Sequence, residues 1–448
     1  MKDAMRDKAV HIISLGCPKN RVDSEVMLGL LVARGHGIAA TPDEADTVII
    51  NTCTFIHEAT QESLDTILEV AELKRAGLCR LVIATGCLAQ RYGPTLAREI
   101  PEIDFWIGTE QFPRIVEWVD KKPIDLERVA IQRTGFIYDH TTPRLLSGPP
   151  GSAYVKIAEG CSRRCSFCVI PSLRGEARSR SIESIVQEAS ALADQGIKEI
   201  NLVAQDVTSY GLDLKDGTNL TGLLDRLRRI EKLKWIRLLY AYPDGMGLEL
   251  LRQVRASERI CNYIDLPIQH IDEQILHRMG RSARRRHIEG LIGMIRKEIP
   301  GVCLRTTLMV GFPGETEAQF SDLSDFVEKV CFDRLGVFQF SPEEGTRAAR
   351  MRHQVPADVK NRRFERLMTA QQEISLRRHR ELVGKEVVVL VEGRDPRDGV
   401  MKGRMESQAP DIDGHVTIIG SDASPGDMVR VRVTQAHPYD LEGEMLEE

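Results

Sequence analysis

The feature that most limits what this chain can fold into is a group of three cysteines, Cys161, Cys165 and Cys168, in the stretch GCSRRCSFC. Thiolates hold iron–sulfur clusters, and three local cysteines can hold three irons of a cubane and leave the fourth open. The stretch follows a predicted strand at 153–159, so its loop would emerge at the C-terminal rim of a parallel barrel. Phe167 would cover one face of the cluster. A structural zinc site with a distant fourth ligand and a chance grouping are the alternatives.

Three further cysteines each follow a predicted strand in the first third of the chain. The strands span 10–16, 47–51 and 81–86, and the cysteines are Cys17, Cys53 and Cys87. Apolar strands that alternate with helical segments predict a parallel, doubly wound α/β sheet, whose strand ends converge on one edge. The three thiols would meet there and could hold a second cluster. Ordinary buried cysteines are the alternative.

The rest of the chain predicts two more domains. A segment rich in Pro, Gly, Ser and Thr at 139–152 is typical of a linker, and six β/α units after it predict a partial or complete parallel barrel. After a long polar helix at about 356–383, short Val-rich strands predict a small, antiparallel, OB-like barrel. We place the domain boundaries at 8–125 (N-terminal domain), 126–152 (linker), 153–380 (central barrel) and 381–448 (C-terminal barrel).

Hydropathy and charge bear on location and partner. No stretch approaches the roughly 18 apolar residues of a membrane helix, and the N-terminus lacks the apolar core of a signal peptide. We therefore expect a cytoplasmic protein without membrane contact, in which ten cysteines do not form structural disulfides. Residues 381–448 carry 7 Lys and Arg against 15 Asp and Glu, a net charge of −8. An RNA-binding tail should be basic, so this tail suits a basic protein partner.

The expected contacts of the acidic tail are side chains that cluster in its predicted turns, namely Glu392, Asp395, Asp398, Asp411 and Asp413. Complementary charge would mainly speed the encounter with a basic protein. Solvated turn residues are the alternative, because Asp favours turns anyway.

The three-part layout resembles the radical S-adenosylmethionine (SAM) methylthiotransferase family, whose C-terminal domain is of the TRAM type. Within that family, SLGCPKNRVDSE (14–25), IPSLRGEARSRS (170–181) and DLPIQH (265–270) are similar to the RimO branch. The branch that modifies tRNA typically has Gln-Met-Asn where this chain has Pro18-Lys19-Asn20, and Ser-Gly-Ser where it has His270.

The resemblance implies two 4Fe-4S clusters, one on each cysteine set, and SAM bound to the open iron. An electron from a donor such as flavodoxin or ferredoxin would cleave SAM, and the resulting 5′-deoxyadenosyl radical would abstract hydrogen from the substrate. The implied activity inserts a methylthio group at the β-carbon of an aspartate in small-subunit ribosomal protein S-twelve. A methylthiotransferase that acts on a tRNA adenosine is the main alternative, and a non-catalytic iron–sulfur or RNA-binding protein is the other.

Three polar side chains on or just after predicted barrel strands are candidates for SAM binding: Gln205, Arg305 and Gln339. An arginine at the rim could pair with the SAM carboxylate through a bidentate contact. The alternative is that all three are satisfied by neighbouring protein groups.

Overall fold

The computed structural model describes residues 9–120, 127–396, 399–420 and 422–446, and the chain divides into two compact units. The first unit contains Met1–Ser147, Ala158–Arg163 and Cys168–Arg180. The second contains Gly148–Ile157, Arg164–Phe167 and Ser181–Glu448. No helix of the described residues is both long and apolar enough to cross a membrane.

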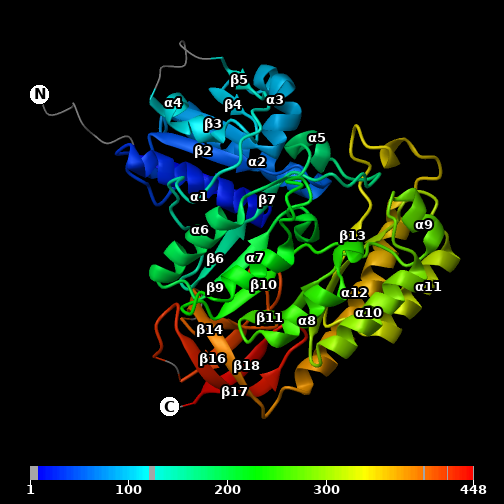
Figure 1. Ribbon diagram of the computed structural model, residues 1–448. Helices are drawn as coiled ribbons and strands as arrows, with labels where there is room; N and C mark the ends of the chain where they lie inside the picture. The colour runs from blue at the N-terminus through cyan, green and yellow to red at the C-terminus, as the bar shows by residue number, and fades with distance from the viewer. Residues whose placement is uncertain (1–8, 121–126, 397–398, 421, 447–448) are drawn as a thin grey trace, which may run out of the picture. The chain divides into compact units, whose positions relative to one another are not determined.

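The first unit is built on a parallel sheet of five strands in the order β1-β2-β3-β4-β5 (Figure 1). The strands are β1 (Val10–Ser14), β2 (Thr47–Thr52), β3 (Leu81–Gly86), β4 (Phe105–Ile107) and β5 (Val129–Ala130). The helices between them are α1 (Pro18–Ala33), α2 (His57–Arg75), α3 (Cys87–Glu99) and α4 (Ile115–Asp120). Every residue of β2 and β3 is buried, as their continuous apolar runs predict for a parallel sheet covered by helices.

A short bridge makes this sheet doubly wound. Ile38, which follows α1, pairs in parallel with Val10 of β1, whereas β2 pairs along the length of the same strand. The chain thus winds one way through α1 and the other way through α2 and α3. The winding direction changes between β1 and β2, and ligands of open α/β sheets bind at the carboxyl ends of the strands at such a switch point.

The segment predicted as a linker is partly docked on the first unit. Arg144 Nη2 contacts Glu25 Oε2 of α1 at 2.5 Å, and the backbone N–H of Ser147 donates to Glu25 Oε1 at 2.9 Å. Leu145 N–H donates to the backbone carbonyl of Glu25 at 3.0 Å. Because β5 also joins the sheet, the N-terminal unit extends past the expected boundary at 125, as far as Ser147.

The second unit contains an open, parallel, six-stranded sheet in the order β13-β12-β11-β10-β9-β6, so the barrel is partial. Its strands are β6 (Ser152–Lys156), β9 (Glu199–Val203), β10 (Trp235–Leu238), β11 (Ile260–Asp265), β12 (Cys303–Val310) and β13 (Arg334–Gln339). Its helices are α6 (Ile182–Asp194), α7 (Leu220–Leu227), α8 (Leu248–Ala256), α9 (Glu273–Arg278), α10 (Arg285–Glu298), α11 (Glu317–Val330) and α12 (Ala357–Arg380). Local sequence sets the helix starts: Thr316 and Gln319 form a capping box at the start of α11.

The end of the chain forms a closed barrel in the order β14-β15-β16-β18-β17 (Figure 1). The strands are β14 (Glu386–Arg394), β15 (Met401–Met405), β16 (Val416–Ile419), β17 (Met428–Ala436) and β18 (Leu441–Met445). Alternate residues point inward and form one apolar core, which includes Val389, Val391, Val431 and Val433. Closure leaves no unpaired sheet edge, as the OB-like prediction requires.

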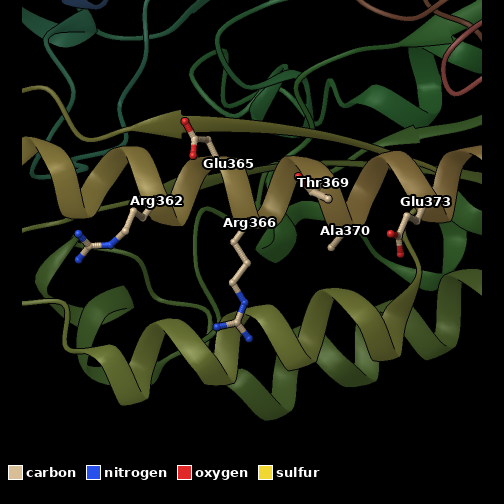
Figure 2. Close-up of a pocket in the computed structure, with 6 residues that line it drawn as sticks. All are labelled: Arg362, Glu365, Arg366, Thr369, Ala370 and Glu373. Atoms are coloured by element: carbon tan, nitrogen blue, oxygen red, sulfur yellow. The ribbon is translucent and has the colours of Figure 1, made fainter.

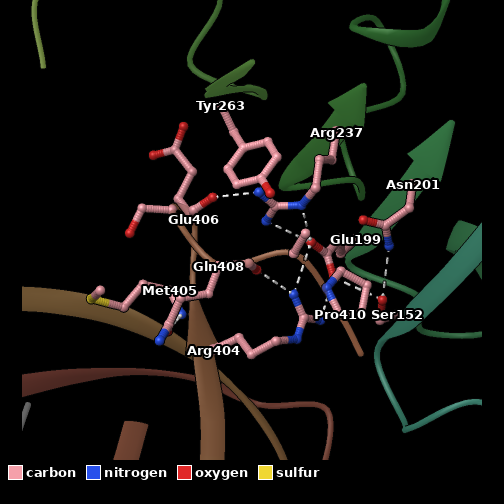
Figure 3. Close-up of polar contacts among 12 residues, drawn as sticks. Ser152, Glu199, Asn201, Arg237, Tyr263, Arg404, Met405, Glu406, Gln408 and Pro410 are labelled. Atoms are coloured by element: carbon pink, nitrogen blue, oxygen red, sulfur yellow. Dashed lines mark hydrogen bonds and ion pairs between the residues drawn. The ribbon is translucent and has the colours of Figure 1, made fainter. Parts of the chain in front are cut away.

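A buried ion network joins this small barrel to the start of the parallel strands (Figure 3). Glu199, the first residue of β9, accepts from Arg237 Nη2 at 2.8 Å and from Arg404 Nη2 at 2.6 Å. Ser152 Oγ donates to the same carboxylate at 2.7 Å. Burial opposes ionisation of Glu199, but Arg404 and Arg237 lower its pKa to about 2. The two arginines and the glutamate thus form one fully buried triad, which connects β9 and β10 of the parallel sheet to β15 of the small closed barrel.

The acidic residues expected to dock a partner mostly serve internal contacts instead. Glu392 pairs with Arg404 at 2.6 Å, and Asp395 pairs with Lys402 at 2.5 Å. Asp411 accepts from Tyr154 Oη at 2.9 Å, and Asp413 accepts from Tyr263 Oη at 2.7 Å. Asp398 lies outside the described residues. The expectation that these carboxylates are free to meet a partner is therefore corrected for the four described ones, because Arg, Lys and Tyr of the same unit already engage them.

A buried histidine gives the second unit a predictable pH dependence. His379 on α12 is 3% exposed and contacts the His437 carbonyl through Nδ1 at 2.8 Å. Burial and nearby Arg334 lower its pKa from 6.5 to about 4, although Asp440 opposes this. In the unfolded chain this histidine binds a proton near pH 6.5, whereas in the folded protein it stays neutral down to about pH 4. Its contribution to the free energy of unfolding is therefore complete above pH 6.5 and is lost as the pH falls toward 4.

We expect His379→Asn to remove this dependence. Between pH 7 and pH 5 the wild type should lose about 2 kcal/mol that the variant does not lose, because each pKa unit is worth about 1.36 kcal/mol. Urea unfolding at the two pH values measures the difference. His287→Asn, at an exposed histidine, is the control and should keep the wild-type slope. Equal slopes in wild type and His379→Asn would contradict the assignment.

Candidate functional site

The three N-terminal cysteines lie at the carboxyl ends of β1, β2 and β3. Cys17 is the N-cap residue of α1, Cys53 follows β2 directly, and Cys87 is the first residue of α3. Cys17 and Cys87 each raise the pKa of the Cys53 thiol by charge, so the three sulfurs lie within electrostatic reach of one another. The structure therefore brings this predicted set together at the topological switch point.

Two glycines make room for these thiols. Gly16 has φ of +86°, and a Cβ there would lie 2.6 Å from Cys53 Cβ and 2.8 Å from Cys53 Sγ. Gly86 has φ of +92°, and a Cβ there would collide with the Asn51 side chain and the Thr52 carbonyl. Neither position accepts a side chain, and at Gly16 the missing Cβ leaves room beside Cys53 Sγ for a bulky inorganic cluster.

The thiols differ in how readily they ionise. Burial raises the pKa of Cys53 to about 12, and it raises that of Cys87 as well. Burial also opposes ionisation of Cys17, but Lys19 and Arg174 lower its pKa below the ordinary value. Metal binding must therefore displace protons from at least Cys53 and Cys87.

A buried arginine that the sequence analysis did not single out lies beside this site. Arg174 ends α5 (Ile170–Arg174) and is 2% exposed. Its Nη1 contacts Glu159 at 2.9 Å and Asp23 at 3.1 Å, and its Nη2 donates to Asn20 Oδ1 at 2.5 Å. Its charge and a hydrogen bond favour the thiolate of Cys87. Its place in the motif at 170–181 was visible in the sequence, but its partners were not.

Asn20 ties this arginine to the strand ends. Its Nδ2 donates to the carbonyls of Leu15 at 3.0 Å and Thr52 at 2.9 Å, which lie just after β1 and at the end of β2. Asn51 donates in turn to the Asn20 carbonyl at 2.8 Å. The backbone that carries Cys17 and Cys53 is thus fixed by protein hydrogen bonds.

Among the described residues, no three His, Cys, Asp or Glu side chains are grouped as ligands of a single metal ion. A cubane places each thiolate on a different iron, so its ligands need not have the spacing of a mononuclear site.

The second cysteine set lies on a loop with no helix or strand between 161 and 169. In the first unit, Cys161 N–H donates to the Gly175 carbonyl at 3.0 Å. In the second unit, Ser166 N–H donates to the Met279 carbonyl at 2.8 Å, and Ser166 Oγ donates to the Arg278 carbonyl at 2.8 Å. Cys161, Cys165 and Cys168 form no disulfide and are all partly exposed. The backbone of this loop is fixed while its thiols stay accessible.

Phe167 packs on an apolar cluster of the second unit. The cluster contains Ile275, Met279, Phe312, Phe340 and Ala348. Its members come from α9 and from segments that follow β12 and β13, so this aromatic side chain is held at the C-terminal rim of the barrel.

The three candidates for SAM contact lie in different places. Gln205 follows β9 and stays at the C-terminal rim. Arg305 is the third residue of β12 and so lies near the N-terminal end of the strand, opposite to the rim. There it contacts Asp265 at 2.8 Å and Asp413 at 3.8 Å. Gln339 donates to Asn361 of α12 at 2.9 Å and so faces the outer helix. Arg305 thus lies near the N-terminal end of its strand, whereas Gln205 and Gln339 lie at or just after the C-terminal ends of theirs, and the assignment of all three to SAM stays a prediction.

Two surface cavities lie elsewhere in the second unit. One, of about 410 Å³, runs along α12 and is lined by Arg362, Glu365, Arg366, Thr369, Ala370 and Glu373 (Figure 2). Its Arg366 points toward α11, where the guanidinium lies 5.5 Å from the centre of the Phe320 ring. The other, of about 430 Å³, includes Arg305, Arg334 and Tyr439. Neither is lined by a predicted cluster cysteine.

Comparison with protein families matches each part of the chain. Residues 9–108 match the uncharacterized protein family UPF0004, residues 155–327 match the radical SAM superfamily, and residues 383–446 match the TRAM domain. Among solved structures, the radical SAM methyltransferase TsrM from Kitasatospora setae has a TM-score of 0.53 and 16% identity, and the match covers 74% of this chain and 75% of that one. The cobalamin-dependent radical enzyme OxsB has a TM-score of 0.51 and 12% identity, covering 81% and 56%. These two structures support the fold alone.

The fold and the matching family models define a radical SAM enzyme with an extra N-terminal domain and a TRAM domain. A curated relative from Geotalea uraniireducens, named ribosomal protein uS12 methylthiotransferase RimO, is 48% identical over all of both chains. One of the same name from Geobacter sulfurreducens is 51% identical over 98% of each chain. The chain belongs to the RimO family of methylthiotransferases. It is a transferase of methylthio groups that, as a member of the radical SAM and methylthiotransferase families, uses SAM and 4Fe-4S clusters as cofactors.

Proposed function

We propose that this enzyme inserts a methylthio group at the β-carbon of an aspartate in small-subunit ribosomal protein uS12. The observation that carries the proposal is 48–51% identity, over essentially the whole chain, to relatives that bear the name uS12 methylthiotransferase. Similarity that covers all three domains includes the parts that bind substrate as well as those that bind cofactor.

The charge of the C-terminal domain supports a protein substrate. Residues 381–448 carry a net charge of −8, which would repel the phosphates of an RNA and attract a basic ribosomal protein. The four described acids with internal partners do not supply free docking contacts. Exposed acids such as Asp422 and Glu444 remain available for them.

Two sets of cysteines would hold the two clusters. Cys161, Cys165 and Cys168 would hold one cluster and leave an iron open to SAM, with Gln205 at the same rim. Cys17, Cys53 and Cys87 would hold the auxiliary cluster. When bound, the clusters and SAM supply an electron, a hydrogen-abstracting radical, sulfur and a methyl group. Reduction would require a small electron donor such as flavodoxin or ferredoxin.

The test is a substrate comparison with reconstituted, reduced protein under anaerobic conditions. Incubation with SAM should release 5′-deoxyadenosine and add a methylthio group to uS12, and mass spectrometry of the protein and of digested tRNA identifies the acceptor. Transfer to tRNA instead of uS12 would move the substrate assignment to the tRNA branch.

The matched variants separate chemistry from folding. The triple variant Cys161→Ala, Cys165→Ala, Cys168→Ala should lose 5′-deoxyadenosine formation down to background. Cys261→Ala, at a cysteine of β11 that is 2% exposed, should keep it. Normal SAM cleavage by the triple variant would refute the assignment of the radical cluster.

A further inference from the structure

We propose that Arg174 is a positioning residue of the auxiliary cluster, which holds a positive charge against the thiolates and so raises the reduction potential of the cluster. The inference rests on the proposed function, because it requires a cluster on Cys17, Cys53 and Cys87. Nothing in the sequence motif itself assigns this arginine a role.

Arg174 is buried together with both of its carboxylate partners. Arg174 is 2% exposed, and the side chains of its partners Asp23 and Glu159 are 5% and 8% exposed. A buried charge is costly unless it is paired and hydrogen-bonded, and replacing such an ion group by apolar residues is often neutral or stabilising. Stability alone therefore gives weak reason to place an arginine with two carboxylates here.

The orientation of the Arg174 guanidinium is fixed by its hydrogen bonds. Asn20 and Asp23 of α1 and Glu159 from a second segment hold the guanidinium within the first unit. The planar fork is fixed by these contacts, and the same guanidinium also acts on Cys87 and Cys17. A lysine would place the charge but not the fixed fork.

The charged side chains around Arg174 nearly cancel one another before any cluster is bound. Arg174 with Asp23 and Glu159 carries a net charge of −1, and buried Lys19 beside Cys17 brings the group to neutrality. Each thiolate adds a negative charge, and reduction of a cluster adds one more. A fixed cation beside the sulfurs favours the reduced form, and hydrogen bonds and charge near sulfur are established determinants of cluster potential.

Arg174 also links the stretch that follows Cys168 to the site around Cys87. It ends α5, and Val169 and Leu173 of the same stretch pack against Cys87. Thr109 Oγ1 donates to the Leu173 carbonyl at 3.1 Å. The stretch that directly follows Cys168 is therefore anchored on the auxiliary site through a shared core and through Arg174.

The test measures the midpoint potential of the auxiliary cluster by an electron paramagnetic resonance titration. The full-length chain carries Cys161→Ala, Cys165→Ala and Cys168→Ala, so that only the auxiliary cluster contributes. Arg174→Met should lower the equilibrium constant for reduction of the cluster at least tenfold, which lowers the midpoint potential by about 59 mV for one electron. Asp23→Asn, which removes a negative charge, should raise the potential, and Arg174→Lys should restore most of the loss.

Arg144→Met is the matched control, because Arg144 is also buried and paired with a glutamate, Glu25, in the first unit. It should leave the potential unchanged. If Arg174→Met holds too little iron to titrate, Arg174→Gln decides the sign, because it removes the charge but keeps an amide donor. A midpoint potential equal to that of the parent in the variant that removes the Arg174 charge would overturn the role of Arg174. A parent that binds no iron would instead refute the cluster assignment, and the inference with it.

Discussion

Replacing Cys17, Cys53 and Cys87 together by Ala should halve the iron content of the reconstituted protein, from about eight to about four irons per chain, because each cubane holds four. The variant should still release 5′-deoxyadenosine from SAM, since the other cysteine set supplies that step. It should form no C–S bond, because the auxiliary cluster is the part assigned to sulfur insertion. Iron analysis, product chromatography and mass spectrometry of uS12 measure the three outcomes.

A neighbouring cysteine supplies the control for this experiment. Cys79 is 5% exposed, as are Cys53 and Cys87, but it precedes β3 instead of following it. Cys79→Ala should therefore keep about eight irons and full activity. Normal methylthiolation by the triple variant would show that these thiols are not required for sulfur insertion.

Glu199→Gln should destabilise the second unit by about 3–5 kcal/mol, because it leaves Arg237 and Arg404 buried without their shared carboxylate. Both guanidiniums are essentially inaccessible to water, so solvent cannot replace the lost charge. The loss should appear as a lower midpoint in urea unfolding and as easier proteolysis of the C-terminal barrel.

Glu392→Gln is the comparison for this prediction. Glu392 contacts the same Arg404, but its side chain is 23% exposed, so water can partly compensate the arginine. We expect about 1 kcal/mol or less. Similar losses in the two variants would mean that burial of the triad contributes little to its strength.

The positions of the cysteines at the ends of strands could be predicted from the sequence, because apolar runs and the residues that follow them are local features. The runs before Cys17, Cys53 and Cys87 became β1, β2 and β3. The bridge from Ile38 to Val10 could not be predicted, because one paired residue leaves no periodic pattern. It nevertheless decides where the winding changes direction.

The partners of the polar side chains on the barrel strands could not be predicted from the sequence. Gln339 was placed on the correct strand, but alternation along β13 turns it toward Asn361 of α12. Arg305 was also placed on its strand, but near the end where the C-terminal barrel supplies Asp413. A strand pattern alone gives neither the face nor the partner contributed by another domain.

Long-range partners explain the other differences. Arg174 and Asp23 are 151 positions apart in the sequence, so no local pattern predicts their contact. Asp411 and Asp413 look like exposed turn residues, yet tyrosines from the parallel barrel engage both. The sign of the charge in this domain was predictable, whereas the use of each carboxylate depended on packing.

The hydrogen bonds of Asn20 have a consequence for maturation and repair of the enzyme. Because the strand ends beside Cys17 and Cys53 are held by amide contacts and by an apolar core, we expect the N-terminal domain to fold without metal. Small zinc domains behave in the opposite way and unfold when their metal is removed. If oxygen destroys the auxiliary cluster, the N-terminal domain should therefore stay folded. The cellular assembly machinery could then insert a new cluster without new protein synthesis.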